Sequence, residues 1–139
     1  MPARRCIDDI LAETRARLRR VEPEAAAELA AGGGLLVDIR PVELRRRDGE
    51  IPGATIIDRN VLQWRLDPTS PSRLPGVDES VYRRPVILFC DEGYASSLAA
   101  DDLQRLGLEG ATDLIGGFQA WRRAGLPVTP PPTGQNAAF

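Results

Sequence analysis

The residue with the clearest capacity for chemistry is Cys90. It follows the apolar run 86–89, which has no polar alternation and therefore predicts a strand buried on both faces of a parallel sheet. From Ser97 the apolar residues recur at helical spacing, and Gly107 stands where a C-terminal cap is expected. The thiol is thus predicted to lie where the carboxyl end of a strand meets the amino end of a helix. Open α/β sheets bind ligands at that edge, and the unpaired N–H groups of the helix favour an anion or a thiolate.

The loop that carries this thiol is acidic. Its residues are Asp91, Glu92, Gly93, Tyr94, Ala95 and Ser96. A carboxylate about 4 Å from the sulfur would disfavour the thiolate by about 4 kcal/mol at an effective dielectric near 20. The amino end of a helix stabilises a thiolate by only about 0.3 to 2 kcal/mol. The two acids must therefore turn away from the sulfur, or an arginine from elsewhere must offset them.

Two arginines are candidates for that offset and for substrate binding. They are Arg59 and Arg65, in the segment after the second predicted strand. The alternative for both is a surface ion pair with no functional effect. Cys90 also has a structural alternative, because most free cysteines are small buried core residues.

Composition excludes several classes of function. The chain of 139 residues has no histidine and no lysine, so Cys–His dyads, Ser–His–Asp triads, Schiff-base chemistry and a P-loop are all excluded. The two cysteines, Cys6 and Cys90, cannot form a disulfide framework, and no residues have metal-ligand spacing. A net charge of −2 argues against a nucleic-acid partner. No apolar run has the length of a membrane span or the character of a signal peptide, so a cytoplasmic location is expected.

The remaining elements alternate along the chain and predict one α/β domain with a parallel sheet. Expected strands cover residues 35–39, 55–58, 86–89 and 111–115, and expected helices cover 4–21, 23–31, 41–47, 61–64, 97–106 and 118–125. Residues 1–22 form an amphipathic, arginine-rich helical extension. It could serve a membrane surface or a partner, but its few aliphatic residues favour packing on its own domain. The domain proper spans 23–128, and the proline-rich segment 129–139 is expected to be disordered.

Four stretches together resemble the rhodanese-like (sulfurtransferase) family over roughly residues 23–128. They are Leu-Val-Asp-Ile-Arg at 36–40, Gly-Glu-Ile-Pro-Gly-Ala at 49–54, the strand and Cys90 loop from residue 85, and Thr-Asp-Leu-Ile-Gly-Gly-Phe-Gln-Ala-Trp at 112–121. The resemblance implies a rhodanese-like fold, a five-stranded parallel sheet with helices on both faces. It also implies that Cys90 is the catalytic cysteine. That cysteine would carry sulfane sulfur as a persulfide, without a metal or cofactor, from an anionic or thiol-bound donor to a thiophilic acceptor.

The chemistry expected of the loop agrees with this resemblance. Convergent N–H groups from residues 91–96 would stabilise the persulfide anion, and Ser96 or Ser97 would add a hydroxyl donor while capping the helix. Two positions depart from the family pattern: Ala95 stands where the loop commonly closes with an arginine, and Glu50 replaces a histidine.

Three alternatives stay open. The first is a rhodanese-like binding or regulatory module that is catalytically weak or inactive. The second is a phosphatase-like enzyme, which would need the missing arginine to hold a phosphoryl group. The third is a redox pair of Cys6 and Cys90.

Overall fold

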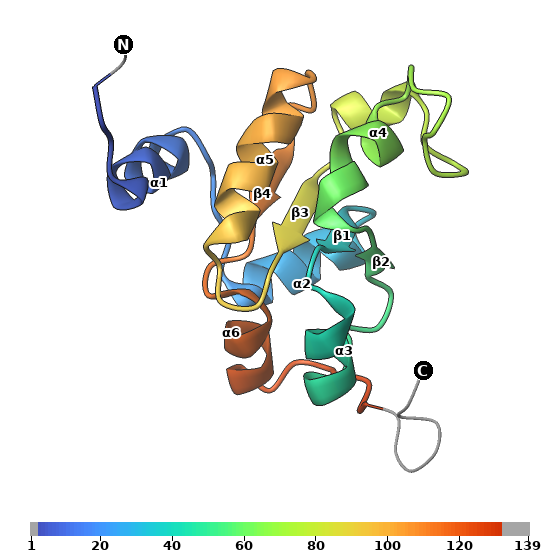
Figure 1. Cartoon of the computed structure of the whole chain (residues 1–139). Coiled ribbons are helices and arrows are strands. Elements are labelled where there is room, and N and C mark those ends of the chain that lie inside the picture. Colours follow the sequence, from blue (N-terminus) through green and yellow to red (C-terminus); the bar gives the residue numbers. More distant parts are fainter. Residues whose placement is uncertain (1–2, 132–139) are drawn as a thin grey trace.

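The computed structural model describes residues 3–131 and shows a parallel sheet between two layers of helices (Figure 1). The sheet has four strands in the order β2-β1-β3-β4. They are β1 (Leu35–Asp38), β2 (Thr55–Ile56), β3 (Val86–Phe89) and β4 (Ala111–Asp113). All three pairings are parallel, with Asp38 opposite Phe89 and Leu88 opposite Asp113. The carboxyl ends of the strands therefore meet at one edge, and Cys90 follows the central strand β3 at that edge.

The prediction of a fifth strand is wrong for the described part of the chain. Val21 takes the place beside β4, but only as an isolated parallel bridge to Leu114. Its N–H donates to the Asp113 carbonyl oxygen at 3.1 Å, and its carbonyl accepts from the Ile115 N–H at 2.9 Å. Pro23 starts the next helix two residues later, so the chain leaves the sheet before a second pair can form.

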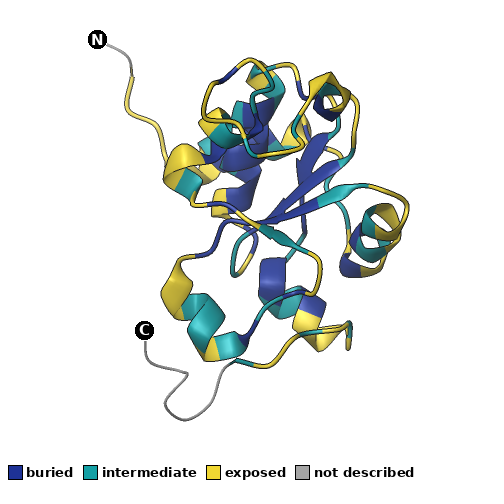
Figure 2. Ribbon diagram, turned by 90° about the vertical axis from the view of Figure 1, so that its right-hand side faces the viewer, coloured by how far each residue is buried: buried dark blue, intermediate teal, exposed yellow. Residues whose placement is uncertain are grey.

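The helices divide between the two faces because alternate residues of the buried strands point to opposite sides. Val86 and Leu88 belong to the core beneath α5 (Ala95–Arg105) and α4 (Leu62–Leu66). Ile87 and Phe89 belong to the core that includes α2 (Pro23–Ala31) and α6 (Gly117–Arg123). Figure 2 shows the central strands and the inner faces of the helices buried, with exposed residues on the outside. None of the helices in residues 3–131 is long and apolar enough to span a membrane.

Most predicted helices are present, with shifted ends. Helix α2 has the predicted bounds, α3 (Val42–Asp48) and α4 lie one residue later than predicted at their start, and α5 begins two residues earlier. Segment 59–84, predicted as a short helix and a long loop, also contains the short 3-10 helices η1 (Arg59–Val61) and η2 (Glu79–Tyr82).

The first helix differs most from its prediction. Helix α1 (Ile7–Ala16) ends five residues before the predicted residue 21. Leu18 is buried in the core beneath α5, and Val21 pairs with the sheet. A helix cannot supply the extended backbone that this pairing needs, so α1 must end first.

The C-terminal chain returns to the domain beside α3. Glu50 and Thr129 exchange backbone hydrogen bonds of 3.0 and 2.7 Å. This pairing includes the first residue of the segment 129–139 that the sequence predicts to be disordered. Residues 132–139 of that segment lie outside the described part.

Candidate active site

Cys90 is half-buried where β3 ends, and its sulfur has two polar neighbours. The N–H of Gly93 donates to Cys90 Sγ at 3.1 Å, and the thiol donates to Ser96 Oγ at 3.4 Å. Gly93 is required for this contact: its φ is +92°, and a Cβ there would lie 2.8 Å from the Gly116 nitrogen. The side chain of Cys90 also packs against the core beneath α5.

The rest of the loop presents unpaired amides. Among the hydrogen bonds of residues 3–131, none uses the N–H of five residues: Asp91, Glu92, Tyr94, Ala95 and Ser96. The last two belong to the first turn of α5, whose N–H groups have no partner within the helix. Backbone N–H groups and the helix dipole at such a place stabilise a negative charge. The loop can therefore hold an anion beside the sulfur.

The acid that follows the thiol turns away from it. Gln119, on α6, donates to Asp91 Oδ1 at 2.9 Å, and Arg47, on α3, lies 3.7 Å from the other carboxylate oxygen. Gln119 also donates to Asp48 Oδ2 at 3.0 Å and so links the two carboxylates. Glu92 is exposed. The sequence required the acids to turn away from the sulfur or an arginine from elsewhere to offset them. Asp91 shows both, since its carboxylate binds Gln119 and lies beside the guanidinium of Arg47.

The cluster around Arg47 fixes the charge of Asp48. Hydrogen bonds from the Arg47 guanidinium hold the pKa of the Asp48 carboxyl below its usual value, and Gln119 lowers it further. The same contact raises the pKa of Arg47. Both groups are therefore ionised at neutral pH, and α3 and α6 are tied together beside the loop.

Helix α6 supports the back of the loop. The N–H of Phe118 donates to the Cys90 carbonyl oxygen at 2.9 Å, and the N–H of Gln119 donates to that of Asp91 at 3.1 Å. These hydrogen bonds require the start of α6 to lie very close to the peptide between Cys90 and Asp91. Gly117 has φ +61°, and a Cβ there would lie 2.5 Å from the Cys90 carbonyl oxygen. The Gly-Gly pair within the stretch 112–121 therefore allows α6 to support the peptide between Cys90 and Asp91.

Sequence reasoning missed a buried carboxylate that a serine hydroxyl links to the sulfur. Asp113, at the end of β4, is fully buried and accepts the hydroxyls of Ser96 and Ser97, each at 2.8 Å on Oδ2. The sequence predicted that Ser96 or Ser97 caps α5, and this is wrong, because both hydroxyls bind a residue of the neighbouring strand instead. Arg20 pairs with the same carboxylate at 2.8 Å. The position of Asp113 at a strand end was the only signal in the sequence, because Arg20 lies 93 residues away along the chain.

The two arginines expected to bind substrate have other partners. Arg59 pairs with Asp102 of α5 at 2.6 Å, and Arg65 donates to the Ser72 carbonyl oxygen at 2.8 Å. Neither guanidinium has a hydrogen bond or ion pair to loop 90–96 within the described residues. Their role in substrate binding stays a prediction. The two cysteines are both free thiols, Cys6 being exposed.

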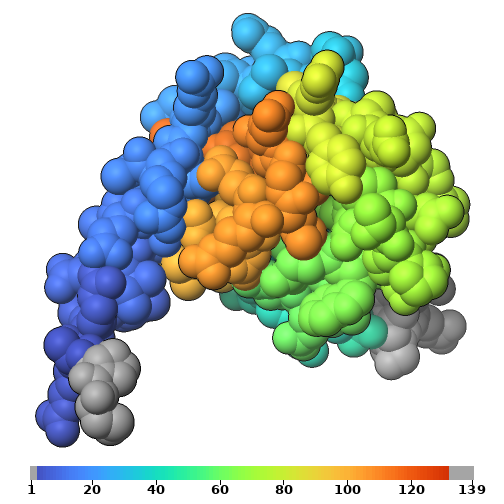
Figure 3. Space-filling view, turned by 90° about the horizontal axis from the view of Figure 1, so that it is seen from above, coloured from blue at the N-terminus to red at the C-terminus, as the bar shows by residue number. Residues whose placement is uncertain are grey.

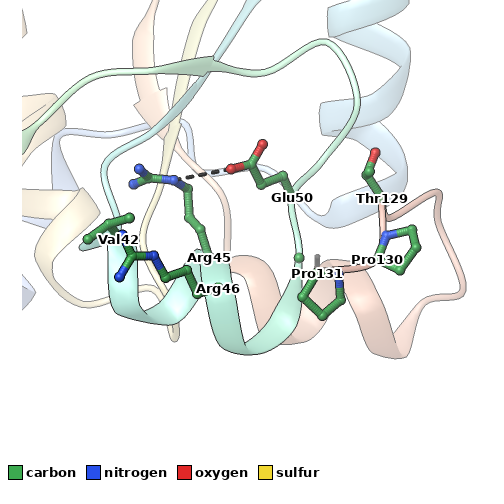
Figure 4. Close-up of a pocket in the computed structure, with 8 residues that line it drawn as sticks. Val42, Arg45, Arg46, Glu50, Thr129, Pro130 and Pro131 are labelled. Carbon is green, nitrogen blue, oxygen red and sulfur yellow. Dashed lines mark ion pairs between the residues drawn. The ribbon is translucent and has the colours of Figure 1, made fainter. Parts of the chain in front are cut away.

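A hollow of about 340 Å³ lies between α3 and the returning C-terminal chain (Figure 4). Its lining includes Arg45 and Glu50, which pair at 3.3 Å, together with Pro130 and Pro131. Glu50, which replaces the family's histidine, therefore helps to join α3 to the C-terminal segment. No residue of the Cys90 loop lines this hollow, and we assign no reaction to it.

Similar proteins share this arrangement of strands and helices. A solved structure from Rhodopseudomonas palustris, described as a protein of unknown function and possible tyrosine phosphatase, is 34% identical. It superposes with a TM-score of 0.80 over 93% of this chain and 99% of its own.

Curated relatives are named thiosulfate sulfurtransferase GlpE. The one from Haemophilus influenzae is 30% identical over 79% of this chain and 93% of its own length. The one from Vibrio cholerae is 35% identical over 43% of this chain, and the match spans only 57% of that relative. The model of the rhodanese-like domain matches residues 22–124, and the chain belongs to that family.

Proposed function

We propose that this chain is a sulfurtransferase in which Cys90 carries sulfane sulfur as a persulfide. One observation supports this most strongly: the sulfur of the half-buried Cys90 lies 3.1 Å from the Gly93 nitrogen, inside a loop whose other amides are unpaired. A buried structural cysteine would have no need of such a loop. Family membership supports the same reaction class.

The reaction is a pair of displacements at sulfur. The Cys90 thiolate attacks the outer sulfur of the donor, the new S–S bond forms, and the donor's leaving group departs with the electron pair of the old bond. The charge of the resulting persulfide rests on its outer sulfur, where the free N–H groups of the loop can bind it. An acceptor thiolate then attacks that sulfur and releases the Cys90 thiolate. No external oxidant or reductant is required.

The loop favours a donor with a single negative charge. Ala95 supplies no guanidinium to bind the donor directly at the end of the loop, while Asp91 and Glu92 add negative charge around it. Thiosulfate carries two negative charges, and the persulfide of a small thiol or a protein carries one. We therefore propose a thiol-bound persulfide as the preferred donor. Arg59 and Arg65 remain proposals for contacts to its more distant groups. The cytoplasm, where such thiols stay reduced, is the proposed location.

Steady-state sulfur transfer to a thiol acceptor tests this function. We expect turnover with a cysteine persulfide donor, slower turnover with thiosulfate, and loss of both in Cys90→Ser. Cys6→Ser is the matched control and should retain full activity, because Cys6 is exposed and outside the loop. Equal activity in Cys90→Ser and the unmodified protein would rule the proposal out.

The alternative is a rhodanese-like binding or regulatory module. The acidic loop favours it, since the loop's carboxylates weaken binding of an anionic donor. Such a module would bind its partner without turning over any sulfur donor. A phosphatase has less support, although one similar structure is described as a possible tyrosine phosphatase. A phosphoryl dianion needs the bidentate arginine that Ala95 cannot supply. Hydrolysis of p-nitrophenyl phosphate that depends on Cys90 would favour the phosphatase.

A further inference from the structure

Two arginines of the N-terminal segment meet at the back of the Cys90 loop. Arg15, near the end of α1, and Arg20, in the link between α1 and α2, both donate to the Gly93 carbonyl oxygen, at 2.7 and 3.1 Å. Both precede residue 22, where the match to the family begins. We propose that Arg15 and Arg20 are positioning residues for Cys90 and supply the positive charge that Ala95 lacks. This proposal rests on the proposed sulfur transfer for its purpose.

Arg15 spans the loop from its middle to the start of α5. Besides the Gly93 carbonyl, its Nε donates to Ser97 Oγ at 3.1 Å. Its guanidinium also lies over the exposed ring of Tyr94, 5.4 Å from the ring centre. One side chain therefore contacts three of the five residues from Gly93 to Ser97. Such a planar, multidentate cation fixes geometry as well as charge.

Arg20 pairs with the buried carboxylate that Ser96 links to the sulfur. It donates to both oxygens of Asp113, at 2.8 and 3.3 Å. Ser96 joins this carboxylate to Cys90 through two successive hydrogen bonds. An unpaired charge so close would disfavour a thiolate or an anionic donor. Arg20 therefore permits a negative charge at the sulfur as well as holding the loop.

The contact of both arginines with the Gly93 carbonyl fixes the direction of the next N–H in the Cys90 loop. In a trans peptide the C=O and the following N–H point in opposite directions. Because the Gly93 carbonyl points to the two arginines, the N–H of Tyr94 must point away from them. It has no partner among the hydrogen bonds of residues 3–131. Two cations on the carbonyl also polarise this peptide and strengthen that N–H as a donor. The contacts of Arg15 and Arg20 with the Gly93 carbonyl thus leave the Tyr94 N–H free to bind an anion.

The N-terminal segment is held firmly enough to act this way. Leu11 and Thr14 of α1 are buried, and Leu18 joins the core beneath α5. Figure 3 shows the N-terminal segment lying alongside α5. Arg17, on the same segment, pairs instead with Asp101 of α5 at 3.0 Å and makes no hydrogen bond to the loop within the described residues. It is the matched control.

The test compares two alkylating reagents in a Cys6→Ser background, where Cys90 is the only thiol. Iodoacetate is an anion and iodoacetamide is neutral, and both react with the same thiolate. Their rate ratio therefore reports the field felt by an anion and not the amount of thiolate or of folded protein. A unit charge about 8 Å away, at an effective dielectric of about 40, changes that ratio about fivefold.

We expect Arg15→Ala and Arg20→Gln each to lower the iodoacetate-to-iodoacetamide ratio about fivefold, and Arg17→Ala to leave it unchanged. Arg15→Lys, which keeps the charge, should retain most of the ratio. An unchanged ratio in Arg15→Ala, or an equal fall in Arg17→Ala, would overturn the proposal. Because Arg15 pairs with no buried carboxylate, whereas Arg20 pairs with the fully buried Asp113, the Arg15→Ala variant should fold even if the Arg20 variant does not.

Sulfur uptake measured on the same proteins separates this proposal from the proposed function. If the unmodified protein takes up no sulfur while the alkylation ratio falls in the Arg15 and Arg20 variants as expected, the sulfur-transfer function is wrong and the positioning role of the two arginines is supported. If the unmodified protein takes up sulfur and the alkylation ratio does not change in the variants, only the positioning role of Arg15 and Arg20 is wrong.

Discussion

Gly117→Ala should damage both the stability of the fold and the Cys90 loop. A Cβ at Gly117 would lie 2.5 Å from the Cys90 carbonyl oxygen and 2.7 Å from the Asp91 carbonyl carbon. Gly125 is the matched control, because its φ of +76° is similar to the +61° of Gly117 but a Cβ there would meet no atom within 4 Å. Both substitutions therefore carry a left-handed backbone cost of about 1 kcal/mol. Only at Gly117 must the Cys90–Asp91 peptide also move.

The size of the extra effect follows from the bonds that this movement disturbs. The contact must lengthen to at least 3.0 Å, which displaces the acceptors of the Phe118 and Gln119 N–H groups, now at 2.9 and 3.1 Å. Each such hydrogen bond contributes about 1 kcal/mol. Gly117→Ala should thus lose about 2 kcal/mol more than Gly125→Ala. In a domain of this size that corresponds to a Tm about 8 °C lower.

Thermal unfolding of the two variants measures that difference in stability. The rate of sulfur uptake at 25 °C measures whether the Cys90 loop still works. We expect slow uptake in Gly117→Ala and normal uptake in Gly125→Ala. Equal Tm values together with equal uptake would refute the claim that α6 holds the thiol's peptide in place.

Three further changes probe the charges around the loop. Ala95→Arg should raise kcat/KM for thiosulfate about tenfold, since a charged hydrogen bond contributes about 1.5 to 3 kcal/mol, whereas Ala95→Gln should not. Asp48→Asn should lower the urea midpoint at pH 7, and the difference should shrink progressively as the pH falls below about 3.9. The pKa of Asp48 is lowered in the folded protein, so its contribution is present above the unfolded value of about 3.9 and is lost as the pH falls through the folded one. Gln119→Glu places a third carboxylate against Asp48 and Asp91, and should cost about 1 kcal/mol in urea unfolding at pH 7, with recovery near pH 4.

The parts of the fold that sequence could predict are those fixed by local pattern. The apolar run of β3 and the period change in α5 place Cys90 between them without reference to the rest of the chain. Pro23 likewise marks the start of α2. The end of α1 was missed because Val21 pairs with Leu114, far away along the chain, and no local signal reports such a pairing.

The polar contacts of the candidate site were harder to predict for the same reason. The sequence required either acids turned outward or an arginine from elsewhere. It named Arg59 and Arg65 because they follow a strand, whereas the arginines that contact the loop in the structure are Arg15, Arg20 and Arg47. Long flexible arginine side chains reach whatever acceptor the fold brings near, so spacing along the chain carries little information about their partners.

The central claim is that Cys90 accepts a sulfur atom from a donor and holds it. Intact mass of the Cys6→Ser protein, after incubation with a cysteine persulfide donor and removal of the excess, measures this most directly. We expect a gain of about 32 Da that maps to Cys90, disappears on adding a thiol acceptor and is absent in Cys90→Ser. A protein that stays at its unmodified mass under these conditions, with Cys90 still open to alkylation, would contradict the claim.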